Sequence, residues 1–235
     1  MFKKKPVVID CYTYDRSAFT FFKPDKGIKF LPNWWKKLPS DLPNAMVNMR
    51  GCAGIIDYYK KGIVIPAWSY FNINIKDKQV NWTSNSGIVE FHAPLQRGTF
   101  AADHVQCKLL SPWVFVCEEE IDFLFNIPIW SFEDTEKVVN LQGIINFKYQ
   151  NATNVNLLLK DSDEGYDFFI KEGTPVAILH PLTDREIVLK YHHVDKETFE
   201  SKISVRYPSR RFDYLNAKKV LKNLESKCPF GFGRK

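Results

Sequence analysis

The chain has 235 residues, of which 45% are hydrophobic and 26% charged, and its formal net charge at pH 7 is +6. This length and composition exclude a disordered tail and allow one large domain whose core needs no disulfide or metal. No apolar run approaches the roughly 20 residues of a membrane-spanning helix and none resembles a secretion signal, so we expect a soluble cytoplasmic protein.

The five cysteines are odd in number, and no two of them form a Cys-x-x-Cys pair. This pattern indicates reduced thiols rather than a zinc or redox site. We predict no cofactor and no metal.

The first 50 residues are predicted to form an N-terminal arm that lies over the rest of the chain. A strand is expected over Val7–Tyr14, and the prolines of "FLPNWWKKLPSDLP" leave room for one helical turn, Asn33–Leu38, with Asn33 as its cap. Trp34 and Trp35 are adjacent on a single turn, so they are not expected to enter one core together. We predict that one of them contacts a partner; the alternative is that both cover the docking site of the arm.

The next stretch, "RGCAGIIDYYKKGIVIPAW", predicts one short internal helix over Ala53–Lys61. Ile55, Ile56 and Tyr59 form its apolar face, and lysines occupy its last turn. Gly62 is expected to end the helix in a left-handed conformation.

From residue 63 to about residue 194 the pattern predicts strands separated by turns, at intervals of roughly 10 residues. The expected strands lie in "IVIPAWSYFNINI", "QVNWT", "GIVEFH", "WVFVCEE", "IDFLFNIPIWSF", "GIINFKYQ", "VNLLLK", "YDFFIKEG", "PVAILHPL" and "REIVLKYHHV". In the strand Val176–Leu179, His180 and Pro181 are expected to lie at a sheet edge, with His180 in a structural role. The fold class predicted is mainly β, a sandwich or distorted barrel with β-clip as one form of it, in a domain over residues 51–208.

Residues 209–235 are predicted to form a basic C-terminal helix and tail. They hold eight Lys or Arg and two acidic residues, so the excess positive charge of the chain lies here. The spacing predicts an amphipathic helix over residues 209–227. Its basic contact face is formed by Arg210, Arg211, Lys218, Lys219 and Lys222. Such a face makes a nucleic-acid partner possible, although no aromatic residues interleave with the lysines.

Two short motifs match part of the spacing of a metal site, but each lacks a residue that the site needs. The "HHVD" stretch places His193 and Asp195 at the His-x-Asp spacing of mononuclear iron oxygenases, but no histidine follows to complete the ligand set, and a solvated strand end is the alternative. The "DSDEG" stretch places acidic residues at the first and third positions of a calcium loop, but Tyr166 stands where that loop needs glycine. A hairpin turn between two strands is therefore expected at residues 161–165.

Catalytic motifs are equally weak. The sequence has neither a Gly-x-Ser-x-Gly elbow nor a phosphate-binding Gly-x-x-x-x-Gly-Lys-[Ser/Thr] loop. The run Glu118–Glu120 with Asp122 is expected to be a solvated strand edge.

Residues 141–179 resemble, in outline, a stretch of the trimeric dUTPase-like β fold. The similarity lies in Gly143–Ile145 and in "FIKEGTPVA". It implies β geometry without the activity, because Asn146 replaces the water-activating aspartate of that family and its Pro-Arg-Ser-Gly motif is missing.

Three further blocks, "PNWWKKLP", "MRGCAGIIDYYKKGIVIPAW" and "IKEGTPVAILHPL", resemble an uncharacterised protein family of bacteriophage and bacterial genomes. The resemblance implies a shared fold unit and no established activity, and "KGI" at residues 61–63 departs from the aromatic helix exit of that family.

We therefore predict a non-enzymatic, β-rich interaction or virion-associated protein of phage type, located in the host cytoplasm or in the virion. Its expected partner is a protein or a second copy of the chain, with contacts through Trp34 and Trp35. The alternative is a small-molecule or nucleotide enzyme, dUTPase-like or metal-dependent, whose pocket is lined by His92, Arg97 and His104.

Overall fold

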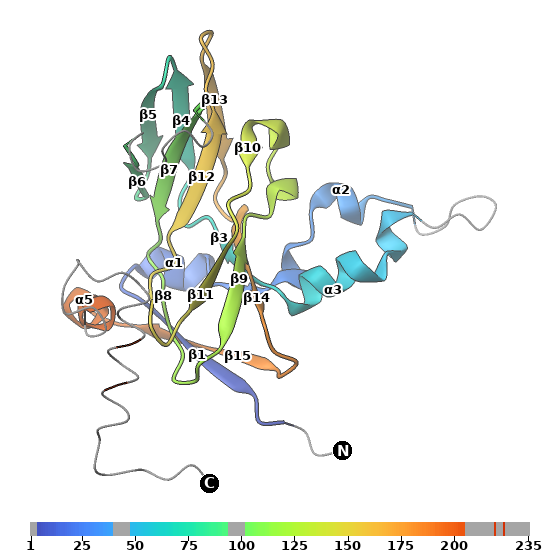
Figure 1. Ribbon diagram of the computed structural model, residues 1–235, viewed down its shortest axis with the longest axis vertical. Coiled ribbons are helices and arrows are strands. Elements are labelled where there is room, and N and C mark those ends of the chain that lie inside the picture. Colours follow the sequence, from blue (N-terminus) through green and yellow to red (C-terminus); the bar gives the residue numbers. More distant parts are fainter. Residues whose placement is uncertain (1–3, 40–47, 94–101, 205–218, 220–222, 224–235) are drawn as a thin grey trace.

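The computed structural model describes residues 4–39, 48–93, 102–204, 219 and 223, and within them the protein is mainly β. Its strands form four sheets, none of which closes into a barrel in the described part of the chain, and a few short helices lie around them (Figure 1). The predicted fold class is confirmed in its sandwich-like form. No helix among the described residues is long and apolar enough to cross a membrane.

Each sheet combines strands that are far apart in the sequence. The first has the order β15–β1–β8, from Ile187–His193, Val7–Thr13 and Val114–Val116. The second has the order β10–β12–β7–β6, from Val138–Val139, Val155–Lys160, His104–Leu110 and Ile88–Phe91. The third has the order β11–β9–β14–β3–β2, from Gly143–Asn146, Asp122–Asn126, Pro175–Pro181, Ile63–Pro66 and Asp25–Lys26. The fourth has the order β13–β4–β5, from Tyr166–Ile170, Phe71–Lys76 and Gln79–Ser84.

One hydrophobic core joins the four sheets. Alternate residues of β1, β4 and β7 are buried, as expected for strands with one face toward the core. Ile9 of the first sheet, Leu157 of the second, Phe123 of the third and Ile73 of the fourth all belong to one buried cluster. Burial of this continuous apolar surface holds the sheets together.

The N-terminal residues contribute to that core. Strand β1 is the middle strand of its sheet, parallel to β15 and antiparallel to β8, and Val7, Ile9 and Cys11 are fully buried. Helix α1 (Arg16–Phe21) follows and is capped by Asp15, whose carboxylate accepts a hydrogen bond from the amide of Ala18 at 2.9 Å. The boundary at residue 50 stays a prediction, but the strand before it is part of the core.

The predicted internal helix is present with the expected bounds, as α3 (Ala53–Lys61). The expected left-handed end is wrong: Gly62 has φ of −75°. Glycine is required there for space, because a Cβ would lie 2.5 Å from Cδ1 of Ile178. The expected cap of α2 (Asn33–Lys36) is also wrong, since Asn33 is the first helical residue and Pro32 precedes it without a side-chain cap.

The predicted turn at residues 161–165 is present but does not form a hairpin, because β12 and β13 belong to different sheets. Gly165 adopts φ of +78°, and Asp161 accepts a hydrogen bond from the amide of Lys78 at 2.8 Å. Strand β14 lies between β9 and β3, but its pairing with β3 ends at Leu179. His180 and Pro181 therefore pair with β9 alone, at the edge position that was expected.

The remaining short elements are 3₁₀ turns, and one helix was not expected. The turns are η1 (Gly27–Phe30), η3 (Met49–Gly51), η4 (Ile129–Ser131) and η5 (Thr135–Lys137). The unexpected helix is α5 (Lys196–Ser204), which packs against β8. Most of the predicted C-terminal helix, with Arg210, Arg211, Lys218 and Lys222, lies outside the described residues. Lys219 is helical and exposed.

Candidate binding site

Two partly exposed tryptophans from distant segments meet at one place on the surface. Trp34 of α2 donates a hydrogen bond from Nε1 to the carbonyl oxygen of Trp130 at 3.3 Å, and their rings are T-shaped with centroids 6.1 Å apart. Each is 40% exposed. We call this pair the tryptophan ridge.

The neighbouring Trp35 is buried and packs behind Trp34. It is 4% exposed, and its ring packs edge-on against Trp34 with centroids 5.9 Å apart. Successive residues of a helix are turned by roughly 100° about its axis, so one indole enters the interior and the next faces outward. The two predicted contact residues therefore have different environments, and that one of them contacts a partner stays a prediction.

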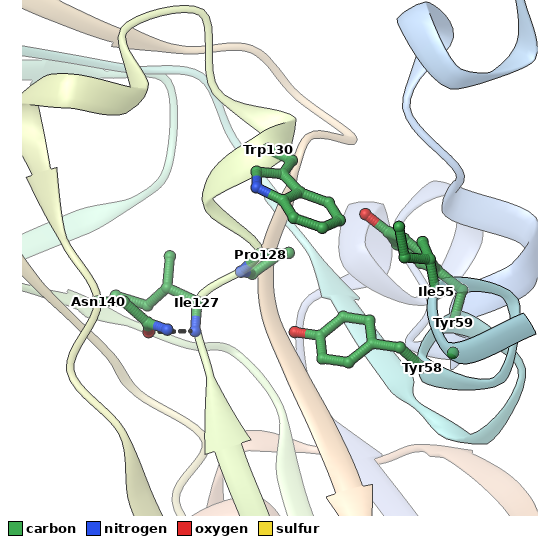
Figure 2. A pocket seen from close by; sticks show the side chains of 8 residues that line it. Ile55, Tyr58, Tyr59, Ile127, Pro128, Trp130 and Asn140 are labelled. Atoms are coloured by element: carbon green, nitrogen blue, oxygen red, sulfur yellow. Dashed lines mark hydrogen bonds between the residues drawn. The ribbon is translucent and has the colours of Figure 1, made fainter. Parts of the chain in front are cut away.

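A cavity of about 310 Å³ lies beside Trp130, between α3 and the segment that follows β9 (Figure 2). We call it the tyrosine cavity. It is lined by Gly54, Ile55, Tyr58, Tyr59, Ile127, Pro128, Trp130 and Asn140. Figure 2 shows the hydroxyl ends of Tyr58 and Tyr59 reaching from α3 toward Ile127, Pro128 and Trp130.

The lining of the tyrosine cavity is uncharged. Burial, with a smaller contribution from Tyr58, raises the pKa of Tyr59 to about 12, and burial also raises the pKa of Tyr58. Both phenols therefore keep their protons at neutral pH and can donate hydrogen bonds. Asn140 accepts the amide of Ile127 at 3.0 Å through Oδ1, which leaves its amide group as a further donor.

A second hollow of about 610 Å³ adjoins the ridge, and we call it the lysine groove. It is lined by Lys29, Phe30, Leu31, Pro32, Asn33, Trp34, Lys36, Trp130, Ser131, Phe132, Glu133, Lys171, Glu172, Gly173, Thr174 and Pro175. Lys171 forms an ion pair with Glu133 at 3.2 Å, and Lys29 forms one with Asp25 at 2.5 Å. The buried hydroxyl of Ser131 has no hydrogen-bond partner among the described residues.

Histidine 180 fixes the helix that carries the tyrosines. Its Nε2 lies 2.8 Å from the carbonyl oxygen of Tyr58, which can only accept, so Nε2 is the donor. The ring also packs against that of Tyr58, with centroids 4.3 Å apart, and burial lowers the pKa of His180. These contacts join β14 to α3 and give His180 the kind of structural role that was expected.

The structure does not bring His92 and His104, two residues expected to line the pocket of the alternative enzyme, into either hollow. His92 follows β6, and its amide donates to the carbonyl oxygen of Gln106, while His104 Nδ1 lies 2.8 Å from the carboxylate of Asp103. Neither histidine lines the tyrosine cavity or the lysine groove. Arg97 lies outside the described residues.

Residues considered as metal ligands also have other roles in the structure. Asp195 caps α5 by accepting from the amide of Thr198 at 2.8 Å, and in the part of the chain that the structure describes no group of three His, Cys, Asp or Glu could hold a metal. The neighbouring His192 of β15 places its Nε2 2.7 Å from the carboxylate of Asp10 in β1. This contact joins the parallel strands β1 and β15.

The acidic run at residues 118–122 is more than a solvated edge. Glu119 pairs with Arg185 through both carboxylate oxygens, and Asp122 accepts from the side-chain amide of Asn146 at 2.7 Å. Tyr149 donates its hydroxyl to Glu120 at 2.9 Å. Asn146 is fully buried and its Oδ1 accepts a hydrogen bond from the amide of Lys148 at 3.1 Å, in the turn after β11.

Comparisons of the chain with protein-family models, with curated proteins and with solved structures find no match. The geometry of the site is therefore what indicates the function. Sequence reasoning found Trp34 but missed Trp130, Tyr58, Tyr59 and Asn140 as neighbours. The available signal was Trp130 itself, a large aromatic residue that follows a strand and a proline in "NIPIWSF".

Proposed function

We propose that this protein is a non-enzymatic recognition protein that binds a protein partner at the tryptophan ridge. The observation that carries the proposal is the pair of 40%-exposed indoles, Trp34 and Trp130, which are held together by a hydrogen bond and lie at the junction of two hollows. Tryptophan is enriched among the residues that dominate binding energy at protein interfaces.

The ridge is well suited to this role because its geometry is set before binding. Trp34 is hydrogen-bonded to the backbone at Trp130 and backed by buried Trp35, so little side-chain entropy is lost on association. Covering the exposed part of the two rings would remove roughly 100 Å² of apolar surface each from water, which is about 2–3 kcal/mol per ring.

The experiment compares capture of partners from extracts of the source cells by three forms of the purified protein, with quantitative mass spectrometry. The forms are wild type, the double variant Trp34→Ser with Trp130→Ser, and Phe169→Ser, which removes a 50%-exposed aromatic of β13 that lines neither hollow. We expect the same partner with wild type and with Phe169→Ser, and its loss with the double variant. Equal capture by all three forms would refute the proposal.

Narrower forms of the proposal rest on the sequence. Resemblance of three blocks to a phage and bacterial family supports a virion-associated component that resides in the host cytoplasm or the particle, and mass spectrometry of purified particles tests it. A second copy of the chain as the partner is tested by native mass spectrometry. Nucleic-acid binding through the basic C-terminal residues is tested by salt-dependent gel shifts.

A further inference from the structure

We infer that the tyrosine cavity receives one uncharged aromatic side chain from an extended, acidic segment of the partner, and that this segment crosses Trp130 into the lysine groove. The inference rests on the proposed function and deepens it, because it gives the chemistry of the partner.

The size and charge of the tyrosine cavity select the anchor. A volume of about 310 Å³ is at the lower end for ligand pockets and matches one large side chain. Trp130, Tyr58 and Pro128 supply flat apolar walls, on which an aromatic ring packs well. No Asp, Glu, Lys, Arg or His lines the cavity, so an ionised side chain would lose its hydration without gaining a counter-charge.

Each of the polar side chains in the cavity can donate a hydrogen bond. The phenols of Tyr58 and Tyr59 stay protonated, and Asn140 has already used its oxygen on Ile127. Donors at the wall of an apolar cavity suit the carbonyl oxygens of a peptide that inserts one side chain. They offer no advantage to a purely aliphatic group.

The lysine groove gives the direction and charge of the rest of the segment. It shares Trp130 with the tyrosine cavity, so one extended chain can occupy both. Three lysines and two glutamates line the groove. Lys29 is paired with Asp25 and Lys171 with Glu133, whereas Lys36 makes no ion pair with any described residue. This excess of one lysine over the glutamates, with Lys36 unpaired among the described residues, favours acidic residues beside the anchor.

Four peptides test this chemistry directly. They are acetyl-Asp-Asp-Trp-Asp-Asp-amide, the same peptide with alanine or with glutamate in place of tryptophan, and acetyl-Lys-Lys-Trp-Lys-Lys-amide. Binding is followed through the indole N–H signals in nitrogen-15 NMR spectra, with the Trp130 signal identified from Trp130→Phe. We expect the first peptide to shift that signal and the other three to bind at least tenfold more weakly.

A pair of arginine variants on α3 gives the matched control. Ile55→Arg places a charged side chain at the cavity wall, whereas Asp57→Arg places the same residue at an exposed position of the same helix that does not line the cavity. We expect Ile55→Arg to lose binding of the first peptide at least tenfold and Asp57→Arg to keep it, with circular dichroism confirming that both are folded.

Equal binding of the four peptides, or no binding by folded wild-type protein, would overturn the inference. Its failure is distinguishable from failure of the proposed function: if Ile55→Arg captures the cellular partner as wild type does while the ridge variant does not, the ridge binds a partner and the cavity does not hold its anchor. Loss of capture by Ile55→Arg, together with binding of the first peptide, supports both.

Discussion

Replacing Gly27 with alanine should push the end of α3 away from η1, the 3₁₀ turn that begins at Gly27. The Cβ would lie 2.6 Å from the backbone oxygen of Tyr59 and 3.3 Å from that of Gly62, while the Gly27 amide donates to the latter oxygen at 2.7 Å. The nearest obstacle is backbone, so a rotamer change cannot relieve the clash, and the last turn of α3 has to move.

The cost follows from two opposing effects. Overpacking a fitted site costs about 1–3 kcal/mol, whereas the smaller conformational freedom of alanine in the unfolded chain returns about 0.4–1 kcal/mol. We therefore expect Gly27→Ala to lower the free energy of unfolding by about 1–2 kcal/mol, which moves the urea midpoint down by roughly 0.5 M at a slope of about 3 kcal/mol/M.

The assay is equilibrium unfolding in urea, followed by circular dichroism. Gly143→Ala is the control, because a Cβ at that exposed strand position meets no atom within 4 Å, and its midpoint should be unchanged or slightly raised. A midpoint for Gly27→Ala equal to that of wild type would refute the close approach of η1 and α3.

Three further changes test other contacts by the same unfolding assay. Asn151→Ala removes buried hydrogen bonds to the carbonyl oxygens of Phe115 at 2.7 Å and Phe147 at 2.9 Å, and it should lower the free energy of unfolding by about 2–3 kcal/mol. The control Asn81→Ala, at an exposed position, should change it by less than about 0.5 kcal/mol. An equally small effect of both variants would contradict the hydrogen bonds of Asn151. Tyr166→Phe removes a hydroxyl that donates to the carbonyl oxygen of Lys160 at 2.6 Å and should cost about 1 kcal/mol, unless that bond is absent in solution. Burial lowers the pKa of His180 below 6.5, so the unfolded chain binds its proton more readily and the free energy of unfolding should fall as the pH drops below 6.5. In His180→Gln this loss between pH 7 and pH 5 should be smaller. The same dependence of the free energy of unfolding on pH in wild type and variant would argue against this role of His180.

The sequence predicted much of the secondary structure because alternation and helical spacing are local signals. Helix α3 has its expected bounds, and the expected strands from β3 to β15 are present. Strand β7 was missed although Val105, Cys107 and Leu109 alternate into the core, because no clear turn marks its start. Helix α5 was missed because it buries only Phe199 and has no apolar stripe.

The site was less predictable because its parts are far apart in the chain. Adjacent tryptophans in a proline-bounded turn indicated that one indole would be outward, and Trp34 is the more exposed one. Its contact with Trp130 spans 96 positions and required the third sheet to hold β9 beside β14. Nothing in the local pattern of either segment specified that contact.

The sequence by itself determined the elements that depend on neighbours a few residues away: the amphipathic strands and the helix over Ala53–Lys61. Tertiary structure alone decided that β1 pairs with β15, that β14 is an interior strand, and that Trp130 lines one hollow with Tyr58 and another with Trp34. The physical reason is that side-chain periodicity fixes which face of an element is buried, whereas the choice of partner depends on packing and hydrogen bonding summed over the whole core.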